Sequence, residues 1–182
     1  MTYITLFSGR HLDPFHPETD AIDIQDIAHA LSLLCRGNGH VKFFYSVGQH
    51  SLACAREAAA RDLSCRVQLG CLLHDASEAY LSDITRPVKQ QLPIYREAET
   101  KVQSAVWTKY FSQPLTAEEL GQIKEIDDDM LSFEFKFLMP EEINERYKRI
   151  LSDICCEPMN PIDVEKNFLH AFEILTTCPG DT

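Results

Sequence analysis

Long hydrophobic runs are missing from the sequence. No window of the 182 residues approaches the roughly 18 consecutive apolar residues that a membrane-spanning helix needs. The first ten residues, MTYITLFSGR, also lack the basic region and the apolar stretch of a secretory signal peptide. We therefore expect a cytoplasmic protein that has no membrane partner.

Basic residues are also scarce. The chain has 17 Lys and Arg against 28 Asp and Glu, which gives a formal net charge of -11. A surface that binds nucleic acid is normally basic, so we expect no nucleic-acid partner. A small phosphorylated ligand remains compatible with this charge, because a local basic pocket can lie on an acidic protein.

The cysteines show no C-x-x-C pair. There are seven of them, an odd number, and several fall within apolar helical stretches, where a reduced cysteine packs as a small hydrophobic residue. We therefore expect reduced cysteines in a reducing cytoplasm, with disulfides as the alternative.

The sequence has no internal repeat, low-complexity tract or linker, and its length suits one domain, residues 1–182. Apolar periodicity and capping residues predict six helices. Their ranges are 26–36, 46–62, 64–81, 93–111, 115–138 and 164–175. Segments 3–7 and 21–24 could pair as a short β-hairpin. The expected fold is an all-α bundle of about five to seven helices.

Ionisable residues lie on the apolar stripes of three predicted helices. On 46–62, helical spacing places His50 on the same inward face as Val47, Cys54 and Ala58. On 64–81, the inward stripe carries His74 and Asp75 and then Glu78, one turn after His74.

On the helix predicted for 115–138, the apolar face is centred on Asp127, whereas its neighbours Asp128 and Asp129 turn away from it. Two imidazoles, of His50 and His74, and two carboxylates, of Asp75 and Asp127, are thus expected to point into one core. This mixed nitrogen and oxygen set suits a divalent first-row metal ion, which would neutralise the buried carboxylates. A hydrogen-bonded core histidine is the alternative for either imidazole alone.

The order His, then His-Asp, then Asp resembles the HD-domain superfamily of metal-dependent phosphohydrolases. The motifs read SVGQHS, CLLHDASEAY and KEIDDDML. The segment HDASEAYLSDITRPVK is similar to a small bacterial and phage-associated branch that includes 5'-deoxynucleotidases. The resemblance runs from about residue 5 to 138, with a core over 24–138, and leaves 139–182 as a C-terminal extension.

The resemblance implies an HD-type bundle that binds one divalent ion through His50, His74, Asp75 and Asp127. Mn, Co or Fe is expected, and Mg, Zn or Ni is compatible with the same ligands. It also implies catalytic roles for Asp75, as a metal ligand, and for Glu78, which would position or deprotonate the attacking water.

The substrate contacts implied in the same way are Arg36 for the phosphate and Asp83 for the deoxyribose hydroxyl. Lys89 and His40 are further candidates, although a solvated lysine is an equal alternative for Lys89. One position departs from the deoxynucleotidase pattern: Gly37 stands where an aromatic residue would face the sugar. Another aromatic residue, Phe43, Phe44 or Tyr45, would have to replace it.

The function expected from this pattern is a 5'-nucleotidase acting on deoxyribonucleoside monophosphates. The alternatives are a triphosphohydrolase acting on deoxynucleoside triphosphates and a non-catalytic nucleotide-binding or interaction module. A homodimer is compatible with all three functions. A further hypothesis concerns Glu134, seven residues after Asp127 on the same helical face. We expect it to be buried and paired with Arg36 or Arg86 in support of the metal ligands.

Overall fold

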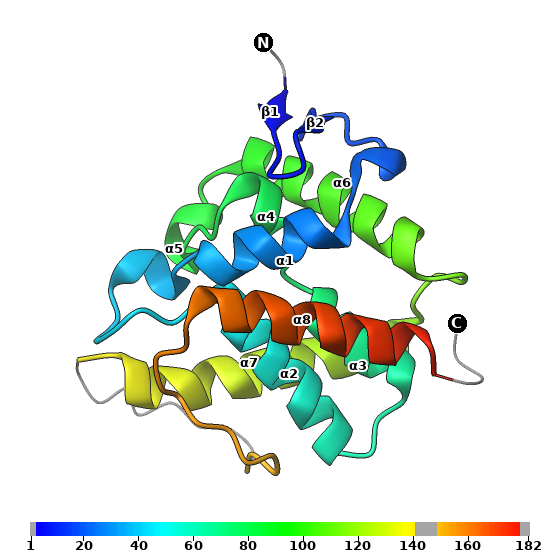
Figure 1. The fold of residues 1–182 in the computed structure, drawn as a ribbon. Helices are drawn as coiled ribbons and strands as arrows, with labels where there is room; N and C mark the ends of the chain where they lie inside the picture. Colours follow the sequence, from blue (N-terminus) through cyan, green and yellow to red (C-terminus); the bar gives the residue numbers. More distant parts are fainter. Residues whose placement is uncertain (1–2, 141–148, 179–182) are drawn as a thin grey trace.

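Helices make up most of the structure, a computed structural model that describes residues 3–140 and 149–178. This confirms the predicted all-α class (Figure 1). The α-helices are α1 (Ile24–Leu33), α2 (Val47–Ala60), α3 (Cys65–Leu73), α4 (Glu78–Leu81), α5 (Arg86–Lys89), α6 (Pro93–Tyr110), α7 (Ala117–Leu138) and α8 (Pro161–Thr176). Two short 3-10 helices, η1 (Thr19–Ala21) and η2 (Arg36–Gly39), and two strands, β1 (Ile4–Thr5) and β2 (His11–Leu12), complete the described elements.

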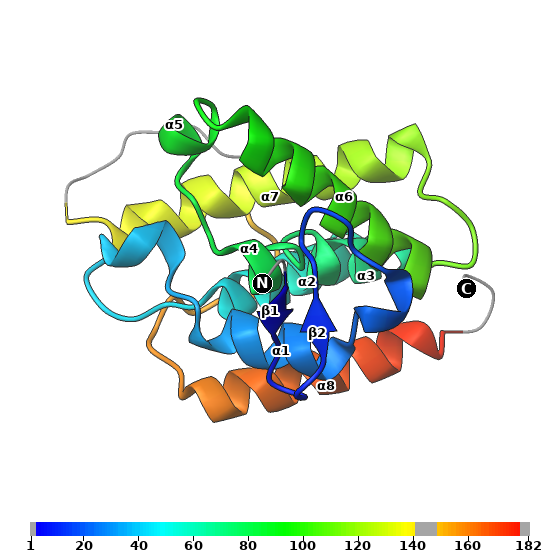
Figure 2. The same cartoon turned by 90° about the horizontal axis from the view of Figure 1, so that it is seen from above.

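Helices α2 and α3 form the centre of the molecule. They pack against each other, and each also packs against α7 and α8. Viewed from above, they lie between α7 on one side and α8 on the other, with α1 running beside α8 (Figure 2). The side chains at this centre are fully or almost fully buried; they include Ile27, Leu31, Leu72, Ile126, Met130 and Phe168.

Side-chain caps fix where the central helices begin. The Ser46 hydroxyl accepts a hydrogen bond from Gln49 N, and the Gln49 side chain reciprocates, so α2 starts with a capping box. Thr116 and Glu119 form the predicted capping box of α7. Because the caps set the start of each helix, they also set which residues face inward, and therefore where His50 and Asp127 point.

The N-terminal hairpin differs from the prediction. Ile4 of β1 pairs with Leu12 of β2, and not with a residue of 21–24, where η1 ends and α1 begins. Gly9 in the connecting turn has a φ of 83°, a left-handed conformation that glycine adopts without steric cost. This turn returns the chain onto β1 before residue 21 is reached.

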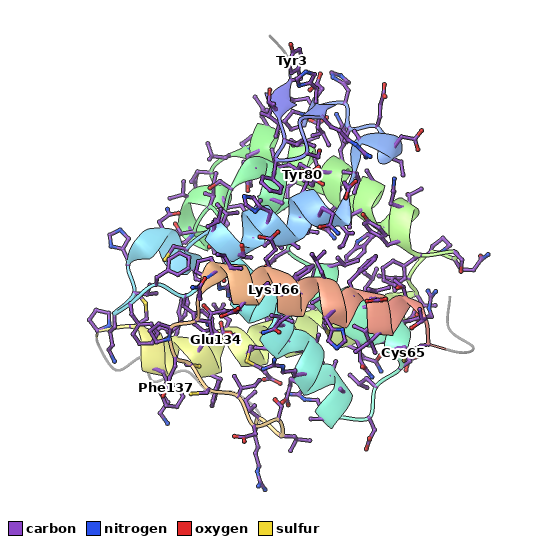
Figure 3. The ribbon with its side chains drawn as sticks, in the orientation of Figure 1. Tyr3, Cys65, Tyr80, Glu134, Phe137 and Lys166 are labelled. Carbon is purple, nitrogen blue, oxygen red and sulfur yellow. A yellow bond between two sulfur atoms is a disulfide. The ribbon has the colours of Figure 1, made fainter. Side chains whose placement is uncertain are left out.

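The expectation that all cysteines are reduced is wrong for one pair. A disulfide joins Cys65, the first residue of α3, to Cys178, two residues after α8 ends. Cys65 lies beside the C-terminal end of α8 (Figure 3). The two cysteines are separated by 113 residues, so local periodicity carries no information about their pairing. Among the other described cysteines, Cys54 and Cys71 are buried and free, as predicted.

The helix predicted for 64–81 is not continuous. Helix α3 ends at Leu73, residues 74–77 form a turn, and α4 begins at Glu78. In this turn Ala76 N donates to Leu73 O at 3.0 Å and Glu78 N donates to Asp75 O at 3.0 Å. These hydrogen bonds span three residues instead of four, so the chain is wound more tightly here than in an α-helix.

None of the helices in the described part of the chain is long and apolar enough to cross a membrane.

Candidate metal centre and adjoining cavity

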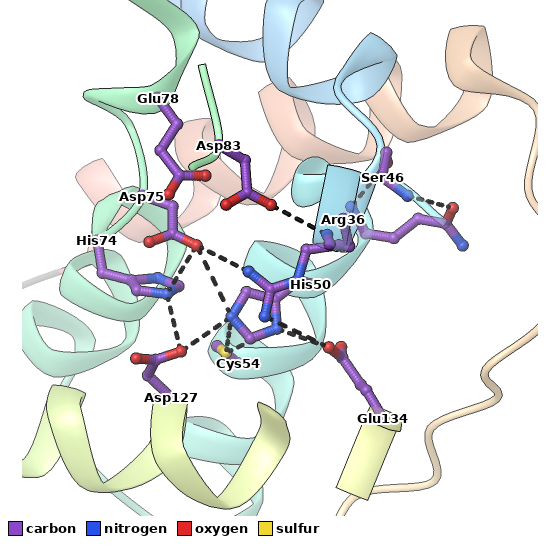
Figure 4. A network of polar contacts seen from close by, with 12 residues as sticks. Arg36, Ser46, His50, Cys54, His74, Asp75, Glu78, Asp83, Asp127 and Glu134 are labelled. Atoms are coloured by element: carbon purple, nitrogen blue, oxygen red, sulfur yellow. Dashed lines mark hydrogen bonds and ion pairs between the residues drawn. The ribbon is translucent and has the colours of Figure 1, made fainter. Parts of the chain in front are cut away.

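The four predicted metal ligands converge on one point from three segments (Figure 4). His50 comes from α2, His74 and Asp75 from the turn after α3, and Asp127 from α7. His50 Nε2 lies 3.1 Å from Asp127 Oδ1 and 3.8 Å from Asp75 Oδ2. His74 Nε2 lies 3.2 Å from Asp75 Oδ2 and 3.5 Å from Asp127 Oδ1. Both imidazoles therefore face both carboxylates through the same ring atom.

The opposite nitrogen of each ring has its own partner. His74 Nδ1 lies 2.8 Å from the carbonyl oxygen of Cys71, which can only accept, so Nδ1 must carry the proton. His50 Nδ1 lies 2.9 Å from Glu134 Oε2. In a neutral imidazole this leaves a lone pair on Nε2. Metal-binding histidines are typically held in this way, by a carbonyl or a carboxylate on the nitrogen that does not bind the ion.

A lone pair that faces a carboxylate is repelled unless a cation or proton lies between them. His74 Nε2 is buried and makes no hydrogen bond within the described part of the chain, although Asp75 and Asp127 lie close to it. This unpartnered atom, together with the two carboxylates, fits a bound metal ion.

The electrostatics of these residues agree with a site for positive charge. Burial alone would lower the pKa of His74, but the negative charge of Asp75 outweighs burial and raises the pKa well above its ordinary value. Burial alone would raise the pKa of Asp75, but the neighbouring His74 lowers it to about 2. The pKa of Asp127 is lowered for the same reason, by His50 and His74 against the effect of burial.

Cys54 is a potential ligand that sequence reasoning did not propose. The ligand atoms of His50, Cys54 and His74 all lie within 4.8 Å of one another, so this group could hold a metal ion. Cys54 Sγ is 3.6 Å from His50 Nε2. Its spacing of four residues after His50 places it on the predicted inward face, where the sequence alone indicates a small apolar residue. The same spacing would have identified it as a candidate ligand.

Glu134 lies directly behind the ligands and is fully buried. Besides binding His50, it accepts a hydrogen bond from the Tyr45 hydroxyl at 2.8 Å, and its Oε2 lies 3.9 Å from Arg36 Nη2. This confirms that Glu134 is buried and paired with Arg36. The other proposed partner, Arg86, instead contacts Asp128 at 3.3 Å.

A cavity of about 350 Å³ opens beside the four ligands. The predicted catalytic and substrate-binding residues line it together, namely Arg36, His40, Asp75, Glu78, Asp83 and Lys89, and so does Asp127. A second part of its wall is apolar and consists of Ile84, Pro87, Leu131, Phe135 and Met139. The volume lies at the lower end of the range for small-molecule sites, about 300–1,000 Å³.

The predicted aromatic replacement for Gly37 lies elsewhere. Tyr45 is 1% exposed and turned toward Glu134, and neither Phe43 nor Phe44 is among the described residues that line the cavity. Phe135 of α7 supplies the aromatic side chain instead. Sequence periodicity did not single it out, because it directly follows the inward-facing Glu134.

Glu78 is a buried carboxyl group in the cavity wall. Its Oε1 lies 3.5 Å from Lys89 Nζ, and its Oε2 has no hydrogen-bond partner among the residues described. Burial, together with the negative charges of Asp75 and Asp83, raises the pKa of Glu78 well above its ordinary value. A carboxyl group with a raised pKa in a cavity is a candidate general base.

The short helix η2, which carries Arg36 and Gly37, is joined to the chain after α4 by a hydrogen bond from its backbone. Asp83 Oδ2 accepts a hydrogen bond from Gly37 N at 3.2 Å, and Gly37 has a φ of 58°. Close to this contact, Arg36 is 7% exposed and its Nη1 lies 3.4 Å from Asp75 Oδ2. Arg36 therefore connects the cavity wall to the ligand carboxylate.

The comparisons with known proteins do not assign an activity. No protein-family model matches the chain. It is 38% identical over 115 residues to the uncharacterized protein YfdR of Escherichia coli, covering 63% of this chain and 62% of that protein. It is also 38% identical over 111 residues to an uncharacterized protein of Rhodobacter capsulatus, covering 58% of this chain and 56% of the relative. The chain thus spans less than two thirds of each of these relatives.

Proposed function

We propose that the chain is a metal-dependent phosphohydrolase that cleaves the phosphate ester of nucleotides, with deoxyribonucleoside 5'-monophosphates as the preferred substrates. One observation carries the proposal. The convergent His50, His74, Asp75 and Asp127 lie in or beside a cavity whose wall also contains a buried arginine and a buried carboxyl group, one oxygen of which has no hydrogen-bond partner among the residues that the structure describes.

The proposed ligands are His50, His74, Asp75 and Asp127, with Cys54 outside the set. Cys54 Sγ lies 3.6 Å from His50 Nε2, but burial raises the pKa of this thiol well above its ordinary value, and a cysteine binds metal as a thiolate. Mixed imidazole and carboxylate ligands suit Mn, Co or Fe, and remain compatible with Mg, Zn or Ni. When bound, the ion would lower the pKa of a coordinated water and polarise the phosphoryl group.

The side chains that line the cavity would bind the substrate and accept the proton of the attacking water. Arg36 can bind a phosphate with two parallel N–H donors. Glu78, in its ionised form, would accept the proton of the attacking water. Asp83 would accept a hydrogen bond from the sugar, while His40 and Lys89 complete the polar wall. The apolar wall around Phe135 would contact the nucleobase.

The charge of the cavity favours a monophosphate over a triphosphate. Among the described residues that line it, the carboxylates of Asp75, Glu78, Asp83 and Asp127 face the cations of Arg36, Arg86 and Lys89. Each of these cations already lies within 4 Å of a carboxylate. A triphosphate would bring more negative charge into the cavity than a monophosphate, and it would have to compete with these pairs.

The decisive experiment measures phosphate release from deoxynucleoside monophosphates, ribonucleoside monophosphates and deoxynucleoside triphosphates, each with Mn, Co, Mg or a chelator. We expect deoxynucleoside monophosphates to be cleaved only with metal. Asp127→Ala should be inactive, and Asp128→Ala is the matched control because Asp128 contacts Arg86 and Lys124 on the exposed side of α7. Activity that survives chelation, or an active Asp127→Ala variant, would contradict the mechanism.

The same substrates and metals separate the alternatives when released triphosphate and nucleotide binding are also measured. Release of inorganic triphosphate from deoxynucleoside triphosphates would identify a triphosphohydrolase instead. Nucleotide binding without turnover under every metal condition would identify a non-catalytic binding module.

A further inference from the structure

A side chain from α6 interrupts the backbone ladder at the His74-Asp75 pair. In a continuous α-helix, Ser77 N would donate to Leu73 O, four residues earlier. Here Gln103 Nε2 donates to Leu73 O at 2.9 Å, and Gln103 Oε1 accepts from Ser77 N at 3.1 Å. The carboxamide of Gln103 therefore occupies the place of one α-helical hydrogen bond. Insertion of a side chain into this ladder is a known cause of local distortion in helices.

The distortion is a tightening of the winding. Beyond the two bonds in the turn itself, Ala79 N donates to Ala76 O at 3.3 Å and Tyr80 N donates to Ser77 O at 3.1 Å. Such a 3-10 winding has 3.0 residues per turn, so residues three apart lie on the same side. Asp75 and Glu78 are three residues apart, and both line the cavity of about 350 Å³ beside the metal ligands, here called the substrate cavity. His74 is not among its described lining residues.

The rotation of each side chain relative to its direction in an α-helix grows along the turn. A 3-10 turn advances about 20° more per residue than an α-helix. Counted from Leu73, the extra rotation is about 20° at His74, the first residue of the turn, and about 100° at Glu78. Relaxation to an α-helix would thus leave His74 near its present direction and turn Glu78 away from the cavity.

Gln103 acts from the opposite side of the turn. It lines a separate cavity of about 310 Å³ together with His74, Asp75, Ser77 and Trp107, and it is not among the described residues around the substrate cavity. An effect of Gln103 on a substrate would therefore pass through the turn 74–77, whose Asp75 borders both cavities.

We infer that Gln103 is a positioning residue: its carboxamide keeps residues 74–77 tightly wound, so that Glu78 faces the substrate cavity beside Asp75. The catalytic consequence rests on the proposed function, but the conformational one does not. Buried backbone N–H and C=O groups need partners. Without the carboxamide, Leu73 O would keep Ala76 N as a donor, but Ser77 N would lose its partner, and Leu73 O is the acceptor that an α-helix provides for it.

The first test is structural and needs no substrate. Gln103→Met keeps the length of the side chain and removes both hydrogen bonds. In its crystal structure we expect Ser77 N to bond Leu73 O and the Glu78 carboxyl group to leave the cavity. A turn that keeps its three-residue hydrogen bonds in this variant would overturn the inference. The matched control is Ser104→Ala, since the Ser104 hydroxyl bonds only Thr100 O among the described residues.

The second test is kinetic. We expect Gln103→Met to lower kcat by about 100-fold or more, because a positioned general acid or base typically contributes about 100- to 10,000-fold. KM should keep its wild-type value, because Arg36 lies outside the turn, and the Mn²⁺ affinity measured by calorimetry should fall less than kcat, because the rotation is about 40° at Asp75 and about 100° at Glu78. An unchanged kcat, or an equal loss of Mn²⁺ affinity, would contradict a role through Glu78.

Gln103→Glu serves as a second variant if Gln103→Met does not fold. It keeps the acceptor for Ser77 N and loses the donor to Leu73 O, so kcat should fall less than in Gln103→Met; a wild-type kcat would contradict the inference. If wild-type protein hydrolyses no phosphate ester, the proposed function fails, and the crystal structure of the variant still decides the role of Gln103.

Discussion

Glu78, the proposed general base, is an ionisable side chain buried among other carboxylates. Burial and the charges of Asp75 and Asp83 raise its pKa above the ordinary value. The folded protein therefore binds this proton more tightly than the unfolded chain does. As the pH rises from the unfolded pKa through the folded one, ionisation of Glu78 costs stability.

The first prediction follows from this loss of stability when Glu78 ionises. Glu78→Gln should abolish hydrolysis and yet raise the Tm at pH 8, because an amide does not ionise. The difference in Tm should vanish below about pH 4, where the carboxyl group is protonated in both states. Thermal unfolding of metal-free protein across this pH range measures it. Glu97→Gln is the control, since the Glu97 side chain is exposed and pairs only with Lys101 among the described residues. A lower Tm for Glu78→Gln at pH 8 would contradict the argument.

Cys54 provides the second prediction at this scale. If Asp75 and Asp127 complete the ligand set with the imidazoles, the bound ion has no sulfur ligand. The Co²⁺-loaded protein should then lack a thiolate-to-metal charge-transfer band, and Cys54→Ser should bind Co²⁺ with wild-type affinity. Absorption titration of both proteins measures this. A charge-transfer band that disappears in Cys54→Ser would show instead that the His50, Cys54 and His74 group holds the ion.

At the scale of elements, the sequence predicted the helices that have strong periodicity and clear caps. Thr116 with Glu119 and the stripe through Asp127 were sufficient to place α7 and its inward carboxylate. Glu134 was predictable for the same reason, because seven residues return to the same face. In all these cases the signal lies within one helix.

Features that depend on a distant segment were not predictable in this way. The end of α3 at Leu73 depends on Gln103, 30 residues later. The apolar pattern of residues 64–81 alone predicts one continuous helix. The disulfide of Cys65 has the same origin. The partner of β1 is different, because β2 lies nearby across a turn at Gly9, and the prediction missed this local signal. For the site, the directions of the ligands were accessible from the sequence, whereas the alignment of Glu78 with Asp75 was not.

The disulfide gives a prediction for two elements, since it ties the first residue of α3 to the chain just after α8. It closes a long loop, since the two cysteines are 113 positions apart in the sequence, and loss of a disulfide typically costs about 2–5 kcal/mol. Cys178→Ser should therefore lower the urea midpoint under oxidising conditions and leave the protein insensitive to dithiothreitol. Cys155→Ser is the control, because Cys155 is free and exposed. Equal urea midpoints for wild type and Cys178→Ser under oxidising conditions would contradict the prediction.

At the scale of the whole molecule, the candidate metal centre connects three parts of the chain that meet only through tertiary packing. Helices α2 and α7 each supply one ligand, and the turn after α3 supplies two. The protein also carries a net charge of -11, and the two candidate ligand carboxylates, of Asp75 and Asp127, line the same cavity as Glu78 and Asp83. A divalent cation would offset their repulsion and hold the three segments together.

Metal binding should therefore stabilise the entire fold, because the unfolded chain does not hold these ligands together. At a free metal concentration of 100 times Kd, the expected gain is about 2.7 kcal/mol. Wild-type Tm should rise with Mn²⁺ or Co²⁺ and return to its starting value with a chelator. Asp127→Ala should lose the increase and Asp128→Ala should keep it, although the two residues are adjacent on α7. A metal-independent Tm in wild type, or an equal shift in Asp127→Ala, would contradict a structural link between the ion and the three segments. Because this measurement uses no substrate, it tests the metal centre separately from the proposed hydrolysis.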